Sequence, residues 1–203
     1  MTESKTCFII SPIGPEGSEI RERANKLKEF VITPPLQNHE YEPVRADDIA
    51  EPGMITTQVI EKVVESELVI ADLTGNNANV FYELAVRHAH QKPIIQLIDS
   101  TDNIPFDIAD TRTIEVDVDD FDSVKEGKQK INAQLSAIES GEEDIDTPIS
   151  VAYQLKNLRE STDPGERSLA DIMEMLSELR TDINTIQSAL DKPDEVLPPE
   201  YIE

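Results

Sequence analysis

The chain has 203 residues, which corresponds to one domain with an extension or to two small domains. Its 42 acidic and 18 basic side chains give a formal charge of −24, which argues against a nucleic-acid backbone or an anionic membrane as the main partner. The single cysteine, Cys7, excludes an intramolecular disulfide and a cysteine-only metal cluster. We see no secretory signal and no apolar run of about 18 residues that would cross a bilayer, and therefore expect a cytoplasmic protein.

Strand and helix patterns alternate through the first 140 residues. Short apolar runs bounded by turn residues predict five buried strands, whereas apolar residues at helical spacing predict the helices between them. The expected strands are 7–10, 41–46, 68–71, 93–98 and 113–116. The expected helices are 18–30, 55–66, 80–91 and 124–140, and Pro34-Pro35 should end or kink the first of them.

This alternation predicts an α/β fold, a five-stranded parallel sheet with helices on both faces. If the strand order is 2-1-3-4-5, strands one and three are neighbours at the point where the order reverses, and ligands bind there beyond the carboxyl ends of the strands. The polar turns 11–17 and 72–79 would then line a crevice.

The C-terminal third is organised differently. An acidic linker with a short helix is expected over 141–166, followed by a coiled-coil helix over 167–192 and a tail over 193–203. Seven aliphatic residues follow one another at spacings of three and four, which is a heptad pattern: Leu169, Ile172, Leu176, Leu179, Ile183, Ile186 and Leu190. The pattern favours a homo-oligomer. A single amphipathic helix packed on its own domain would show the same stripe.

Glu83 is a candidate for chemistry, because it falls within the first two turns of a helix at the expected crevice. If Asn77 or Asn79 caps this helix, the positive helix end would hold Glu83 ionised. An anionic carboxylate at that place suits a nucleophile in glycosyl transfer. The alternative is a solvated helix face with a Glu83–Arg87 ion pair at i,i+4 spacing.

Two other segments are candidates for binding a ligand. Asp72 ends a buried strand, where a carboxylate often orients a ribose or a base, although it would equally cap the following turn. The turn 11–17 could offer backbone N–H groups to a phosphate at the start of the helix near Ser18. A metal site has little support, because His39, His88 and His90 are not spaced as ligands and the acidic stretch 117–122 suits a solvated loop.

Four segments in this order resemble the nucleoside 2-deoxyribosyltransferase-like family, which is related in fold to TIR domains. They are Phe8–Gly14 (FIISPIG), Val44–Ile49 (VRADDI) with Pro52-Gly53, Ile70–Ala85 (IADLTGNNANVFYELA) and Lys92–Ile95 (KPII). The resemblance covers roughly residues 6–97 and continues loosely to about 140. One departure is Ala85, where the family often has glycine.

The resemblance implies a flavodoxin-like fold and several residue roles. Glu83 would be the nucleophile that attacks C1′, and Asp72 would be a second catalytic residue that positions the sugar or base. Substrate contacts are implied for Ser11, Pro12, Ile13, Gly14, Asp47, Asn76 and Asn79. Neither a cofactor nor a metal is implied.

The function implied by the resemblance is cleavage of an N-glycosidic bond, or ribosyl transfer, on a nucleoside, a nucleotide or NAD. Family members often complete their pockets by assembly, so an oligomer acting in stress or antiviral defence signalling is implied as well. The alternative hypothesis is a non-catalytic module that binds a nucleotide as a signal and oligomerises through its C-terminal helix.

Overall fold

The computed structural model describes residues 5–48, 55–105, 108, 111–141, 147–161, 163, 165, 168, 171 and 175. The chain divides into two compact units, Met1–Ser150 and Val151–Glu203. The first unit carries the sheet. Most of the expected coiled-coil segment, 167–192, lies outside the described residues, so that hypothesis stays a prediction.

The sheet has five parallel strands in the order β2-β1-β3-β4-β5. They are β1 (Lys5–Ile10), β2 (Tyr41–Arg45), β3 (Leu68–Asp72), β4 (Ile94–Ile98) and β5 (Thr113–Glu115). The predicted flavodoxin-like α/β fold and its strand order are confirmed. Because β1 lies between β2 and β3, the order reverses at β1, and the carboxyl ends of these strands form the edge where α/β folds bind ligands.

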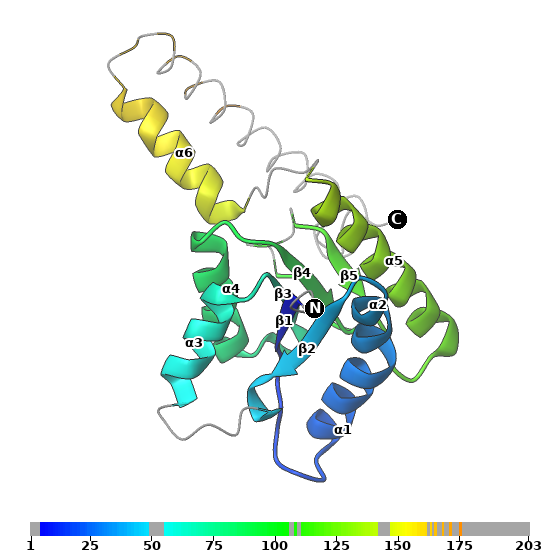
Figure 1. Cartoon of the computed structure of the whole chain (residues 1–203). Helices are drawn as coiled ribbons and strands as arrows, with labels where there is room; N and C mark the ends of the chain where they lie inside the picture. Colours follow the sequence, from blue (N-terminus) through cyan, green and yellow to red (C-terminus); the bar gives the residue numbers. More distant parts are fainter. Residues whose placement is uncertain are drawn as a thin grey trace, which may run out of the picture. The chain divides into compact units, whose positions relative to one another are not determined.

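Helices cover both faces of this sheet (Figure 1). α3 (Ile55–Glu65) and α4 (Ala78–Ala89) lie together on one face, which we call the α4 face. α1 (Glu19–Lys26), η1 (Leu27–Ile32), α2 (Thr33–Asn38) and α5 (Phe121–Ser140) cover the other, the α1 face. Short helical turns η2 (Ala46–Asp48) and η3 (Thr74–Asn76) follow β2 and β3, and α6 (Pro148–Glu160) follows the linker.

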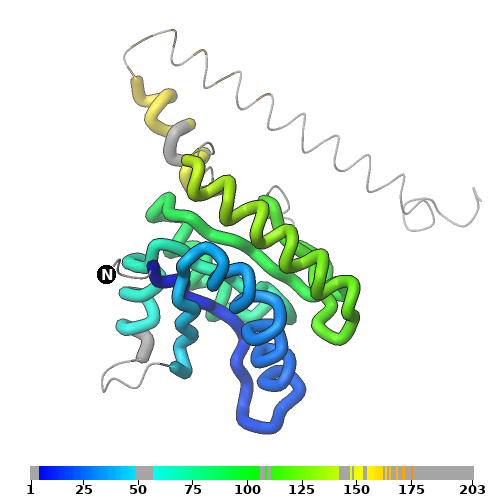
Figure 2. The backbone as a smooth tube through the Cα atoms, turned by 45° about the vertical axis from the view of Figure 1, so that its right-hand side comes forward, coloured from blue at the N-terminus to red at the C-terminus, as the bar shows by residue number. Residues whose placement is uncertain are grey.

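From the sequence we expected Pro34-Pro35 to end or kink the helix after β1, and the helix does not end there. It continues from α1 through the π-helical segment η1 into α2, with Pro34 and Pro35 in the first turn of α2. The N–H and the hydroxyl of Thr33 both donate to the carbonyl of Lys28, which makes a wider π turn. This wider turn leaves room for the two proline rings that follow. Figure 2 shows the continuous path of this helix.

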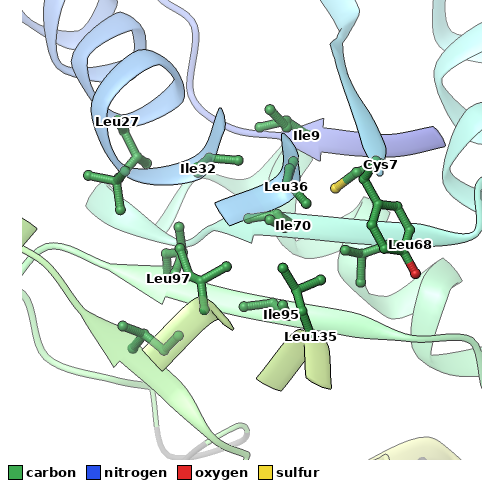
Figure 3. Close-up of a cluster of buried hydrophobic side chains, with 14 of the residues drawn as sticks. Cys7, Ile9, Leu27, Ile32, Leu36, Leu68, Ile70, Ile95, Leu97 and Leu135 are labelled. Atoms are coloured by element: carbon green, nitrogen blue, oxygen red, sulfur yellow. The ribbon is translucent and has the colours of Figure 1, made fainter. Parts of the chain in front are cut away.

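Alternation along the strands divides the core into two clusters. On the α1 face, residues such as Ile9, Ile70 and Leu97 pack with Leu27 and Leu36 (Figure 3). On the α4 face, Phe8 and its neighbours pack against Val59, Val80 and Leu84. The same alternation returns the next residues to the α1 face. These residues are Ser11 after β1, Asp72 at the end of β3 and Asp99 after β4.

Within the described part of the chain, no helix is long and apolar enough to cross a membrane. The same residues contain no cluster of three or more histidine, cysteine or acidic side chains placed to hold a metal ion. In the acidic stretch after β5, Asp120 is the N-cap of α5 and accepts a hydrogen bond from the N–H of Ser123 at 2.7 Å. That part of the stretch therefore has a local structural role.

Candidate functional site

The predicted site residues all follow the carboxyl ends of β1, β2 and β3. Ser11, Pro12, Ile13 and Gly14 come after β1, Asp47 comes after β2, and Asp72, Asn76, Asn79 and Glu83 come after or at the end of β3. The fold thus brings three separate sequence segments to one edge of the sheet. They divide into a charged group on the α1 face and Glu83 on the α4 face.

Asp72 is the centre of the charged group and is completely buried. One carboxylate oxygen accepts a hydrogen bond from Nη1 of Arg23 at 2.7 Å, and the other accepts from the hydroxyl of Thr74 at 2.6 Å. The N–H of Thr74 also donates to Asp72 at 3.3 Å, which is the turn-capping role considered from the sequence. Both oxygens of Asp72 are therefore occupied by partners within the fold.

Arg23 joins Asp72 to the neighbouring strand. Its Nε donates to Asp99, the residue after β4, at 3.0 Å. Asp99 is held in turn by the N–H and hydroxyl of Thr101 and has a lowered pKa, because these bonds and Arg23 outweigh its partial burial. The ends of β3 and β4 are thus linked through one guanidinium from α1.

Asp47 sits in a second ion-pair group beside β2. Its carboxylate accepts hydrogen bonds from Arg45 at 2.6 and 2.9 Å and forms an ion pair with Arg21 at 2.7 Å. The bond from Arg45 lowers the pKa of Asp47 most. Arg45 also donates to the side chain of Asn25 at 2.7 Å, so Asp47 is committed to neighbours that hold α1 against β2.

The loop after β1 is shaped by Gly14 and Ser18. Gly14 has a φ of +61°, and a Cβ there would lie 2.8 Å from the hydroxyl oxygen of Ser18. Ser18 is the N-cap of α1, accepting from the N–H of Arg21 at 3.2 Å and donating to the carbonyl of Pro15 at 2.7 Å. Glycine thus lets the loop pass close to the start of α1.

Glu83 lies on the opposite face, in the second turn of α4. Asn77 caps this helix by accepting from the N–H groups of Asn79 and Val80. The half-buried carboxyl of Glu83 has no hydrogen-bond or ion-pair partner among the described residues. Burial raises its pKa to about 7, contrary to the expectation that the helix end would keep it ionised, because the helix field falls off within the first turn.

The expected alternative of a Glu83–Arg87 ion pair is wrong. Arg87 is fully buried, and its guanidinium donates to the main-chain carbonyls of Val63, Ser66, Glu67 and Pro93 at 2.7–3.2 Å. Burial lowers the pKa of Arg87 to about 10. Since Arg87 is one turn further along the helix and reaches the end of α3, Glu83 lies on the flank of α4 that faces α3.

Some predicted residues are near one another in the fold without direct contact. Among the described residues, no hydrogen bond joins Glu83 to Asp72, and Asn76 and Asn79 are exposed. Sequence reasoning missed Arg23 and Arg45, whose partners are up to 76 residues away. A signal was present for Arg45, since a charged residue at the end of a buried strand needs a buried partner.

No family model matches the chain, and no curated protein is similar to it in sequence. Solved structures are similar to it. A 2-deoxyribosyltransferase from Leishmania mexicana shares 18% identity over 56% of this chain and 75% of its own, with a TM-score of 0.38. A 2-deoxyribosyltransferase from Bacillus psychrosaccharolyticus shares 14% identity over 59% of this chain and 95% of its own, with a TM-score of 0.45.

A third structure, the CMP N-glycosidase of Clostridium botulinum, shares 17% identity over 64% of this chain and 98% of its own, with a TM-score of 0.44. These are the kinds of protein that the four motifs resemble. Each TM-score lies below 0.5, so these structures assign no residue of this chain a role.

Proposed function

We propose that this protein cleaves the N-glycosidic bond of a nucleoside or nucleotide, with Glu83 as the group that attacks the anomeric carbon. The observation that carries the proposal is the state of Glu83. Its carboxyl is desolvated and free of partners among the described residues, at the edge where this fold binds ligands. The four motifs that resemble the deoxyribosyltransferase-like family support the same assignment.

Desolvation suits a carboxylate nucleophile. An ion-paired glutamate would have to break its pair before attacking, whereas Glu83 has lost part of its hydration without gaining a partner. With a pKa of about 7, roughly half of the protein carries an ionised Glu83 at neutral pH. The ionised half is the form that can attack.

The reaction proceeds in two displacements. One oxygen of the Glu83 carboxylate forms a bond to C1′ while the C1′–N bond breaks, and the bonding electron pair leaves with the base, which takes a proton from solvent. The product is a glycosyl ester of Glu83. Water then attacks C1′ and gives a proton to solvent while the bond from C1′ to Glu83 breaks, which releases the sugar or sugar phosphate and regenerates the carboxylate. If a second base attacks in place of water, the reaction is a transfer.

The test is incubation with nucleosides, nucleoside monophosphates and NAD, followed by chromatography of the released base. We expect Glu83→Gln to lower turnover at least about 1,000-fold, since it removes the nucleophile. Glu126→Gln, in an exposed position on α5, is the matched control and should keep full activity. Turnover that persists unchanged in Glu83→Gln contradicts the catalytic role.

Failure of the wild-type protein to release any base would favour the non-catalytic alternative, provided that a nucleotide still binds. Calorimetry with the same compounds separates these cases. A covalent adduct on the peptide that contains Glu83, detected by mass spectrometry after rapid acid quench, would demonstrate the glycosyl ester directly.

The proposal includes assembly through the heptad segment 167–192 and a role in defence signalling. Support for assembly comes from the sequence pattern alone. Light scattering of the whole chain and of a chain truncated after Pro164 tests it. If both have the same number of subunits, the segment does not drive assembly, and a defence role that depends on assembly loses its basis.

A further inference from the structure

Three polar side-chain atoms at the carboxyl edge of the sheet are buried with no hydrogen-bond partner in the part of the chain that the structure describes. They are the hydroxyl oxygen of Ser11, Nη2 of Arg23 and Nη1 of Arg45. We call these three residues the donor cluster. A buried polar group left unpaired costs about 1–3 kcal/mol, and most such groups in folded proteins are satisfied. Three of them at one ligand-binding edge indicate a missing partner.

Arg45 ends β2 and Ser11 directly follows β1, on the same face of adjacent strands, and Arg23 reaches this face from α1. Ile9 pairs with Arg45 of β2, and Ile10 pairs with Ala71 of β3, so Ser11 follows beside Asp72. Side chains of Ile9, Arg45, Ser11 and Asp72 therefore all point to the α1 face, where Arg23 contacts Asp72. With strands about 4.8 Å apart, Arg45 and Asp72, the carboxylate that Arg23 contacts, are about two strand spacings apart, and Ser11 follows the strand between them.

Asp72, which lies beside the donor cluster, has no carboxylate oxygen left for a ligand. Its two oxygens already accept from Arg23 and Thr74, and its side chain is fully buried. The unused hydrogen-bonding capacity belongs to Nη2 of Arg23 and Nη1 of Arg45, which are donors only. A ligand group that fits them must accept hydrogen bonds.

The side chain of Arg45 is 4% exposed, so its free Nη1 is held inside the protein. Hydrogen bonds to Asp47 and Asn25 fix the other nitrogens of this guanidinium. The free N–H groups of Arg45 therefore keep one direction, as preorganised donors of an anion site do.

We infer that the donor cluster binds a phosphate group of the substrate, so that the substrate is a nucleotide and not a free nucleoside. The inference rests on the proposed function for the nucleoside part of the ligand. Asp72 then acts as a positioning residue that orients Arg23, and Arg23 makes the contact to the phosphate. Guanidinium N–H groups and a hydroxyl are the donors that phosphate oxygens accept from.

The local charge also favours this assignment. Over the whole chain, acidic side chains outnumber Lys and Arg by 42 to 18. Beside the donor cluster four cations form ion pairs with four carboxylates: Arg21, Arg23, Lys28 and Arg45, with Asp47, Asp48, Asp72 and Asp99. The charges of these eight ion-paired side chains sum to zero, so a phosphate approaching here meets free donors without a local excess of negative charge.

Binding is measured by calorimetry on the Glu83→Gln protein, in which the proposed turnover is blocked. The ligands are the four common nucleosides, their 5′-monophosphates, NAD and inorganic phosphate. We expect the best monophosphate to bind at least tenfold more tightly than its nucleoside and inorganic phosphate to compete with it. NAD binding as tightly as the best monophosphate would assign the cluster to the phosphates of a dinucleotide.

Two variants test the cluster, and only the first leaves every described hydrogen bond in place. Ser11→Ala deletes a hydroxyl that has no partner among the described residues, so thermal stability should be unchanged or higher, while monophosphate affinity falls about three- to tenfold. Arg23→Lys keeps a cation for Asp72 but removes the free N–H groups, and should reduce the preference over the nucleoside about tenfold. Ser66→Ala is the matched control, since its buried hydroxyl is equally unpartnered but precedes β3, at the opposite edge.

The inference is overturned if nucleosides and their monophosphates bind with equal affinity. It is also overturned if neither the monophosphates nor inorganic phosphate binds. A Ser11→Ala protein that binds monophosphates as tightly as the Ser66→Ala control overturns it as well. The proposed function fails separately, when the wild-type protein releases no base from any compound. A protein that hydrolyses nucleosides and monophosphates equally well would keep the proposed function and lose the phosphate site.

Discussion

Two carboxylates at the same edge of the sheet are in opposite states. Asp72 is fully buried, and both its oxygens accept hydrogen bonds from Arg23 and Thr74. Glu83 is half-buried with no partner among the described residues, and burial raises its pKa to about 7. Burial alone therefore does not set the role of an acidic side chain, because the partners decide whether it is fixed in the fold or left reactive.

The comparison predicts its largest effect at Asp72. Asp72→Ala leaves the guanidinium of Arg23 inside the protein with Asp99 as its remaining carboxylate partner, and should lower the free energy of unfolding by about 3–5 kcal/mol. Urea unfolding measures this value. Asp72→Asn, which keeps the shape and can accept a hydrogen bond, should lose less. A loss below about 1 kcal/mol in Asp72→Ala would show that the network is not structural.

Arg87 tests whether Glu83 is truly independent of its cationic neighbour. Arg87→Met leaves four main-chain carbonyls without their donor, so the free energy of unfolding should fall by about 2–4 kcal/mol. The pH dependence of base release should keep its midpoint, because Arg87 does not pair with Glu83. A shift of that midpoint by a full pH unit would mean that the two side chains interact.

The pH dependence of base release distinguishes a nucleophile from a proton donor at Glu83. As a nucleophile, Glu83 must be ionised, so kcat/KM should rise about tenfold per pH unit below pH 7 and level off above it. A proton donor would give the opposite slope, with kcat/KM falling above pH 7. The profile is measured from pH 5 to pH 9 with a substrate that does not itself titrate in this range.

The smallest effect expected is a gain in stability on removing the Glu83 charge. Because the folded pKa is raised, folding favours the protonated form, and this contribution is lost as the pH rises from about 4.5 through 7. Glu83→Gln should therefore stabilise the protein above pH 7. Because Glu83 is partly exposed, we expect a gain on the order of 1 kcal/mol in the free energy of unfolding, or about 2–4 °C in Tm. Below pH 4.5 the two proteins should have the same Tm. An equal difference in Tm above pH 7 and below pH 4.5 would indicate an effect of packing.

The sheet could be predicted from the sequence because its strands are continuous aliphatic runs closed by polar turns. The expected order 2-1-3-4-5 placed the turns after β1 and β3 at one edge, and the structure has them there. The continuation of the first helix past Pro34 was missed, since the burial of Leu36 against the sheet outweighs the local preference of proline.

The charged partners could not be predicted. Arg87 was expected on a polar helix edge, but its four acceptors are main-chain carbonyls at the end of α3 and before β4, which no side-chain pattern reveals. Arg23 and Asp72 are 49 residues apart, and their contact depends on α1 crossing the edge of β3. Helical spacing predicted that Glu83 would lie on the polar edge opposite the buried stripe, but spacing alone could not show that it is half-buried and lacks a partner among the described residues.

The π-helical segment η1 controls how α1 and α2 face the sheet. An extra residue in a wide turn changes the angular phase between the helix before it and the helix after it, and each residue of a regular α-helix corresponds to about 100°. Shortening η1 by one residue would rotate α1 relative to α2, so that Leu36 could stay in the core only if Arg23 turned away from Asp72. A single-residue deletion in η1, which forms no described hydrogen bond or ion pair with Asp72 or Asp99, would thus disconnect the ion-pair network from the strands.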